Sequence, residues 1–323
     1  MATIDLVVPR SYLDTNDVSA GRRARVEALE RYDLSSITNN LIDKGRYFSP
    51  EQIWPLRDYF GRVDGEIAGL LEREFRRFVA VTILEPGYMY APPGALDMYW
   101  HFFVLHTRDY ARFCGEVWGT AHDHGALPKD IDDTRSPAPM PILPHADTIV
   151  LVQDISLVSQ EIVSGLKEED IRKIYILEHW DLSFFTDRLV EVEAAEGNGR
   201  RFSPEQAWPI VAHFGTASRE VAKAIEEEFK RFIILTLLDE SRAVVTSGSI
   251  DMYLHFLILH TKEYREFCNA MWGRFRHYPF VSLTDTSDVT IKEDFMRTTS
   301  FYRTIFGAMD EHMWCDPTLE LVA

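Results

Sequence analysis

The sequence of 323 residues has few cysteines, no long apolar run and fewer basic than acidic residues. Three cysteines are too few, and odd in number, for a disulfide framework, which favours a reducing compartment. No apolar stretch approaches the roughly 18 residues of a membrane-spanning helix, and the N-terminus shows no signal-peptide pattern. With 34 Lys and Arg against 51 Asp and Glu, the net charge of −17 repels a phosphate backbone. We therefore expect a cytoplasmic protein that binds neither membrane nor nucleic acid.

The common catalytic signatures are absent as well. The sequence has no glycine-rich phosphate loop, no nucleophile elbow and no Cys-x-x-Cys pair. It does contain an internal repeat, because residues 48–119 align without a gap with residues 202–273. Roughly 32 of the 72 aligned positions are identical, far above chance. Upstream, LERYDLSSIT at residues 29–38 matches LEHWDLSFFT at residues 177–186, shifted by six residues.

The repeat predicts an all-α fold of two homologous helical repeats in a pseudo-two-fold arrangement. Apolar residues recur at helical spacing, and no strand-like alternation of any length appears in either copy. The predicted organisation is an N-terminal extension (1–23), a first helical repeat (24–128), a Pro-rich linker and connecting segment (129–171), a second helical repeat (172–282) and a C-terminal helical tail (283–323).

Within the first repeat, the pattern predicts helices at residues 49–60, 66–84, 94–106 and 107–118. Thr107 and its counterpart Thr261 are expected to cap the helices that follow them. Three further pairs of shared residues have a structural interpretation. Cys114 and Cys268 lie on apolar stripes and are expected to pack in the core. The Glu74–Arg77 and Glu228–Arg231 pairs are expected on solvated helix faces.

The pattern Asp-Met-Tyr-x-His-Phe-x-x-Leu-His-Thr occurs at residues 97–107 and again at 251–261. Its Asp and first His are four residues apart, so both side chains lie on one face of a helix. A carboxylate and an imidazole one turn apart can ligate one metal ion, or the carboxylate can orient the ring. The second His can join them only if the helix breaks before the Thr.

One or two further histidines follow the Trp-Gly of each copy. The candidate metal ligands are therefore Asp97, His101, His106, His122, His124, Asp251, His255, His260 and His277. Ligation rich in imidazole suits a transition metal, with iron or copper favoured over zinc. The sequence accordingly predicts a metal-dependent oxidase or oxygenase that acts on a small-molecule substrate. It leaves the catalytic residues and the oligomeric state open.

An alternative gives the same histidines a purely structural role. Apolar residues surround each of them, and a buried histidine usually satisfies its nitrogens with hydrogen bonds to the protein. The chain would then be a non-catalytic helical binding or scaffold protein.

Four segments also resemble a known family. DMYWHFFVLHTRDYARFC (97–114), DMYLHFLILHTKEYREFC (251–268), GRFRHYP (273–279) and YRTIFGAMDEHMW (302–314) are similar to motifs of the bacterial glycine-rich domain-containing protein-like family. The resemblance implies a helical fold and little about chemistry. The chain departs from the family pattern at His106 and His260, where Asp is usual, and it has no glycine-rich domain.

Overall fold

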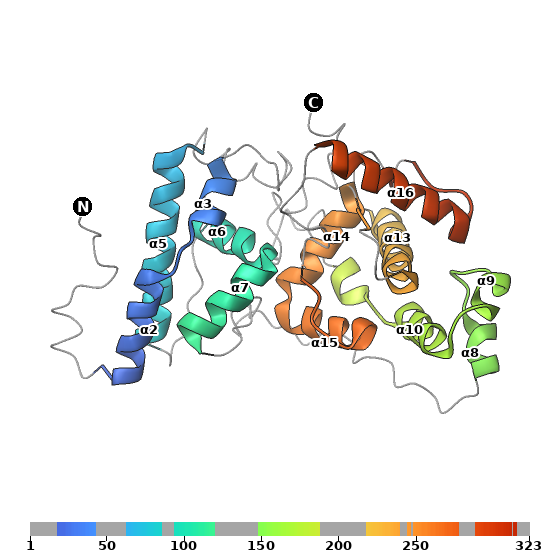
Figure 1. The fold of residues 1–323 in the computed structure, drawn as a ribbon, viewed down its shortest axis with the longest axis horizontal. Coiled ribbons are helices and arrows are strands. Elements are labelled where there is room, and N and C mark those ends of the chain that lie inside the picture. The colour runs from blue at the N-terminus through green and yellow to red at the C-terminus, as the bar shows by residue number, and fades with distance from the viewer. Residues whose placement is uncertain are drawn as a thin grey trace. The chain divides into compact units, whose positions relative to one another are not determined.

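The structure is a computed structural model, and its described part is entirely helical and connecting segments (Figure 1). It describes residues 18–42, 63–85, 94–119, 148–187, 218–239, 244–246, 248–277, 288–311 and 313–314. The chain divides into two compact units, residues 1–132 and 133–323. Each unit contains one copy of the sequence repeat. Among the described residues, no helix is long and apolar enough to cross a membrane.

The helices of the two units correspond in order. The first unit contains α2 (Ala20–Arg31), α3 (Ser35–Ile42), α5 (Gly65–Leu84), α6 (Gly94–Leu105), α7 (Thr107–Phe113) and a π-helical turn, η1 (Cys114–Trp118). The second unit contains α8 (Thr148–Asp154), α9 (Gln160–Ser164), α10 (Glu168–His179), α13 (Arg219–Leu238), α14 (Gly248–Leu259), α15 (Thr261–Trp272) and α16 (Asp288–Phe306). By sequence alignment, α10, α13, α14 and α15 of the second unit correspond to α2, α5, α6 and α7–η1 of the first.

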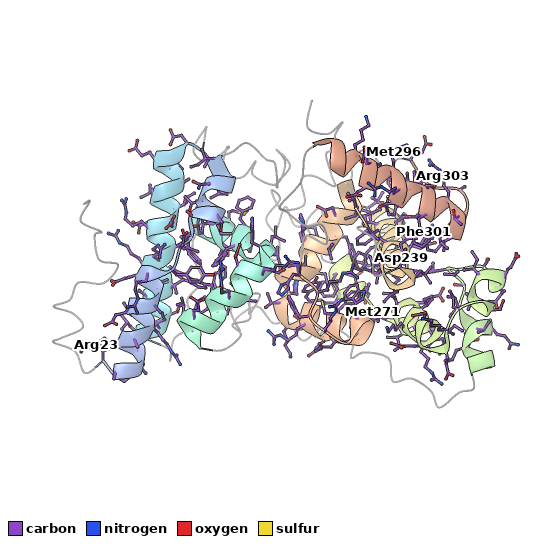
Figure 2. The ribbon with its side chains drawn as sticks, in the orientation of Figure 1. Arg23, Asp239, Met271, Met296, Phe301 and Arg303 are labelled. Atoms are coloured by element: carbon purple, nitrogen blue, oxygen red, sulfur yellow. The ribbon has the colours of Figure 1, made fainter. Side chains whose placement is uncertain are left out.

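The long helices α5 and α13 form the centre of their units. Asp64 caps α5 by accepting hydrogen bonds from the amides of the second and third helical residues, and Ser218 caps α13 by accepting one from the amide of the third. The apolar stripe of α5 places Phe75 and Val79 in the core, both fully buried. Side chains fill the space between the helices within each unit (Figure 2). Each repeat therefore has its own hydrophobic core.

The chain breaks its helix at the second histidine of the shared motif. In the first unit, α6 ends at Leu105 and α7 begins at Thr107, so His106 is the capping residue between them. His260 has the same place between α14 and α15. The predicted capping role of Thr107 and Thr261 is therefore wrong, because each threonine is already the first residue of its helix.

The all-α class and the two homologous repeats are confirmed. The helix predicted at 66–84 begins one residue earlier, and the helix predicted at 107–118 ends in a π-helical turn. The helix predicted at 49–60 lies outside the described residues. The five-segment organisation is finer than the division into two units, so it stays a prediction. The pseudo-two-fold arrangement concerns how the two units are placed relative to each other, and it also stays a prediction.

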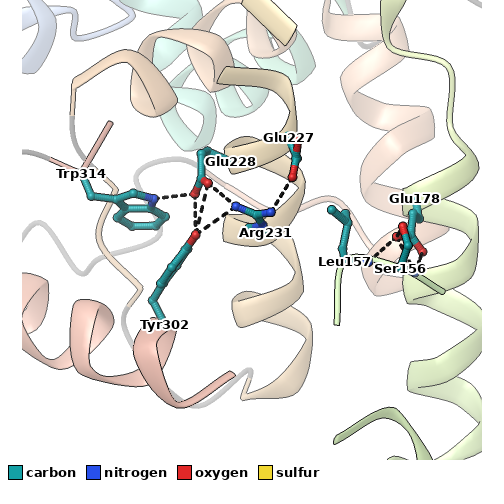
Figure 3. Close-up of polar contacts among 8 residues, drawn as sticks. All are labelled: Ser156, Leu157, Glu178, Glu227, Glu228, Arg231, Tyr302 and Trp314. Carbon is teal, nitrogen blue, oxygen red and sulfur yellow. Dashed lines mark hydrogen bonds and ion pairs between the residues drawn. The ribbon is translucent and has the colours of Figure 1, made fainter. Parts of the chain in front are cut away.

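The second unit has an additional layer that the first one lacks in its described part. Tyr302 on α16 and Trp314 beyond it both donate hydrogen bonds to the Glu228 carboxylate on α13, each at 2.8 Å (Figure 3). Arg231 pairs with the same carboxylate. The Glu228 side chain is consequently only 7% exposed. The prediction of a solvated face is therefore wrong for Glu228, although it holds for its counterpart Glu74, which is 41% exposed.

We expect Glu228→Gln to lower the free energy of unfolding of the second unit by about 1–3 kcal/mol, because a buried carboxylate with charged and neutral donors loses its charge. The matched change in the first unit, Glu74→Gln, should cost less than about 0.5 kcal/mol, since exposed ion pairs contribute little. Urea unfolding of the full chain measures both. Equal effects would show that α16 and Trp314 do not cover Glu228 in solution.

Candidate functional site

Each repeat contains one Asp–His pair at the place where the sequence predicts it. In α6, Oδ2 of Asp97 lies 3.4 Å from Nε2 of His101. In α14, the corresponding distance between Asp251 and His255 is 3.2 Å. The imidazoles are buried, whereas the Asp97 side chain is 37% exposed and that of Asp251 21%. The four-residue spacing thus joins a buried ring to a more accessible carboxylate one helical turn away.

Burial determines the charge of the better enclosed ring. The pKa of His255 is lowered chiefly because its imidazole is removed from water, and the nearby Asp251 carboxylate opposes this shift only in part. The ring is therefore neutral at pH 7. The contact with Asp251 is then one between a neutral imidazole and a carboxylate, which orients the ring more than it forms an ion pair.

The second histidine of each motif forms a hydrogen bond with the backbone. Nδ1 of His106 lies 2.8 Å from the carbonyl oxygen of Phe102, and Nδ1 of His260 lies 2.7 Å from that of Phe256. Because a carbonyl only accepts, the ring proton must be on Nδ1 in both cases. Both rings are buried, and burial lowers the pKa of His106. These histidines supply a donor to a carbonyl beside the helix break, where the helical hydrogen-bond pattern ends.

These positions overturn the predicted metal-dependent function. Among the described residues, no group of three or more His, Cys, Asp or Glu side chains could hold a metal ion. The prediction of a metal-dependent oxidase or oxygenase is therefore wrong. The physical reason is that each Asp–His pair supplies only two candidate ligands, and no third His, Cys, Asp or Glu side chain of the described residues joins either pair.

Of the remaining candidates, His277 is the one that lies within the described residues. His277 follows α15 and packs its ring against Phe275, with 5.0 Å between the ring centroids. His122 and His124 lie outside the described residues. The role of the nine candidates in a functional site and the preference for iron or copper stay predictions.

The structure shows a buried polar network that the sequence analysis missed. In the first repeat, the Thr38 hydroxyl contacts both the Glu72 carboxylate and, at 3.1 Å, the Tyr99 hydroxyl. In the second repeat, Thr186, Glu226 and Tyr253 make the same contacts. The threonine has a single proton. When it is donated to the carboxylate, the tyrosine hydroxyl must donate to the threonine oxygen.

A basic residue completes the network in each repeat. Arg76 lies one turn after Glu72, pairs with its carboxylate at 2.7 Å and also donates to the carbonyls of Leu29 and Tyr32. Lys230 takes this place in the second repeat. It pairs with Glu226 at 3.1 Å and donates to the carbonyls at the end of α10. The basic side chains thus satisfy the last carbonyls of α2 and α10.

A signal for this network was present in the repeat alignment. Thr38 is the last residue of the upstream match, while the glutamate, the basic residue and the tyrosine recur at constant spacing in the longer alignment. Shared polar residues inside apolar helices could have indicated a buried cluster. The partners are far apart in sequence, however, with 34 residues between Thr38 and Glu72 and 61 between Thr38 and Tyr99.

The prediction that the shared cysteines pack in the core is confirmed. Cys114 and Cys268 are buried free thiols. Burial raises the pKa of Cys268 to about 11, so its thiolate is scarce at neutral pH. This thiol is therefore poorly suited to nucleophilic chemistry.

Comparison with known proteins gives one match. The family model UCP032817-like matches residues 25–132 and 186–301, which together make up more than two thirds of the chain. The chain therefore belongs to the UCP032817-like family. The two matched regions cover the first repeat and most of the second, in agreement with duplication. No curated protein and no solved structure matches the chain. The narrower resemblance to glycine-rich domain-containing proteins is not shown, and nothing indicates a glycine-rich domain.

We expect Thr186→Val to lower the stability of the second unit by about 1–3 kcal/mol, because the partly buried Glu226 carboxylate and the buried Tyr253 hydroxyl each lose a partner. Thr186→Ser keeps the hydroxyl and should cost less. Thr38→Val and Thr38→Ser should behave in the same way in the first unit. Urea unfolding of the full chain checks all four, and a Val variant as stable as the Ser variant would remove the stabilising role of the hydroxyl.

A separate prediction concerns pH. Since the folded-state pKa of His255 is lowered, protonation favours unfolding, so its contribution is present above about pH 6.5 and is lost as the pH falls below that value. The loss is at most about 1.4 kcal/mol per pH unit. We expect the stability difference between the parent and His255→Gln to shrink from pH 7.5 to pH 5.5 in urea unfolding. A constant difference would show that the ring is not desolvated.

Proposed function

We propose that this protein is a non-catalytic helical binding or scaffold protein in which each repeat is a self-contained helical unit. One observation carries this proposal: the polar residues that the two repeats share serve the fold of each repeat. The network of Thr38, Glu72, Arg76 and Tyr99 ties helices to one another, and the second repeat reproduces it.

The histidines support the same proposal. His106 and His260 each donate a hydrogen bond to a backbone carbonyl at a helix break. They are the histidines that added a third candidate metal ligand to each Asp–His pair in the sequence. Duplication then keeps them at identical spacing because each copy needs the same break, whether or not the site binds anything. A structural requirement is sufficient to account for the shared pattern.

We further propose a cytoplasmic location and no nucleic-acid partner. The buried free thiols of Cys114 and Cys268 suit a reducing compartment, and the net charge of −17 repels phosphate.

The proposal predicts how the second histidines respond to substitution. His260→Ala removes the donor to the Phe256 carbonyl and should lower the free energy of unfolding by about 1–3 kcal/mol. His260→Asn keeps a side-chain N–H donor and should retain part of this stability. His106→Ala and His106→Asn provide the matched pair in the first unit. Urea unfolding of the full chain, with circular dichroism to confirm helicity, measures all four.

Removal of metal provides the opposing test. A resident metal ion present at about 100 times its dissociation constant would add about 2.7 kcal/mol to stability, which a chelator would remove. We expect EDTA or phenanthroline to leave the urea midpoint of the tag-free parent unchanged. A chelator-sensitive midpoint, together with alanine and asparagine variants that both lose the metal, would overturn the scaffold proposal.

A further inference from the structure

The central helix of the first repeat has an exposed stripe that the second repeat does not have. On α5, Leu70 is 38% exposed and Val81 is 41% exposed. Glu74 and Arg77 lie between them and pair with each other at 2.7 Å, both partly exposed. These four residues, at spacings of four, three and four, lie on one face of the helix. We refer to them as the α5 stripe.

The second repeat shows what this face is like when it is covered. The counterparts of Glu74 and Val81 on α13 are Glu228, which receives hydrogen bonds from Tyr302 and Trp314, and Leu235, which is fully buried. Figure 3 shows the covering residues around Glu228. Within the described part of the first unit, α5 has no such cover. Leu70 and Val81 are therefore large apolar side chains that a second surface would remove from water.

The α5 stripe is complementary to itself. A two-fold axis between positions 75 and 76 of two antiparallel α5 helices brings position 70 opposite position 81, and position 74 opposite position 77. Leu70 and Val81 then lie about 8 Å from the axis on opposite sides, at 1.5 Å per residue. Each Leu70 therefore meets a Val81 of the second copy, and each Glu74 meets an Arg77. The pairs occur twice, as a two-fold interface requires.

Charged residues also flank the stripe in this register. At the two ends, Glu66 falls opposite Glu85, and both are exposed. These like charges weaken the association without blocking the centre of the stripe.

We propose that two copies of this chain associate through antiparallel α5 stripes. The partner is a second copy of the chain, because the α5 stripe itself contains both members of the apolar pair, Leu70 and Val81, and both members of the charged pair, Glu74 and Arg77. The interface is one helix face with like charges at its ends, so we expect a dissociation constant in the micromolar range. This self-association does not depend on the scaffold function proposed above.

The test is sedimentation velocity of the full chain over a concentration range of roughly 1–300 µM, which brackets a micromolar dissociation constant. We expect a monomer–dimer equilibrium that Leu70→Glu and Val81→Glu each weaken at least about tenfold, because each buries a charge in an apolar contact. Met296→Glu changes a 58% exposed apolar residue on α16 and is the matched control, with no expected effect. Circular dichroism confirms that each variant is folded.

Charge variants test the register. Glu74→Arg and Arg77→Glu each place like charges across the axis and should weaken the dimer, whereas the double variant should restore it. Glu85→Lys replaces the repulsion at both ends by attraction and should tighten the dimer about three- to tenfold.

Three outcomes would overturn the proposal. A parent that is monomeric over the whole range would show that the stripe does not bind a second copy. A dimer that withstands Leu70→Glu and Val81→Glu would place the interface elsewhere. A double charge variant that stays as weak as the single variants would exclude the antiparallel register.

Discussion

A partly buried carboxylate in each repeat, Glu72 in the first and Glu226 in the second, is the group on which the arrangement of the surrounding helices depends. A carboxylate withdrawn from much of its water is costly unless partners satisfy it. Here a threonine hydroxyl and a basic side chain do so, and a tyrosine hydroxyl contacts the threonine in turn. The basic side chain also holds the carbonyls at the end of α2 or α10. One carboxylate thereby links elements that the chain contributes from three separate segments.

The duplication preserved this centre and allowed the periphery to diverge. Glu74 and Glu228 occupy equivalent positions and each pairs with an arginine three residues later. In the second unit, a tyrosine from α16 and a tryptophan beyond it enclose the glutamate, whereas in the first unit it faces solvent. The same Glu–Arg spacing therefore has two environments. The difference comes from a segment that follows only the second copy, and it gives the two repeats different surfaces.

The histidines show why shared spacing is a weak argument for chemistry within a duplicated chain. Each copy of the repeat breaks its helix at the same place and needs a hydrogen-bond donor there. His106 supplies this donor in the first copy and His260 in the second. Such a requirement preserves a residue as firmly as a ligand role would. The Asp–His pairs of α6 and α14 were located correctly by the four-residue rule, because that rule describes helix geometry. The rule does not determine whether a third ligand lies nearby.

From the sequence alone one could predict the duplication, the all-helical class and the approximate bounds of α5, α6 and α7–η1, with α5 correct to within one residue of its start. These properties are local, since an apolar stripe every three to four residues is visible along the chain. It did not determine which polar groups meet. Thr38 contacts Tyr99, which is 61 positions away in the sequence, and Trp314 contacts Glu228, which is 86 positions away. Such contacts depend on how helices pack in three dimensions, and helical periodicity contains no information about them. Only the tertiary structure could therefore separate the enclosed Glu228 from the exposed Glu74, and show that the second histidine of each motif bonds to a backbone carbonyl.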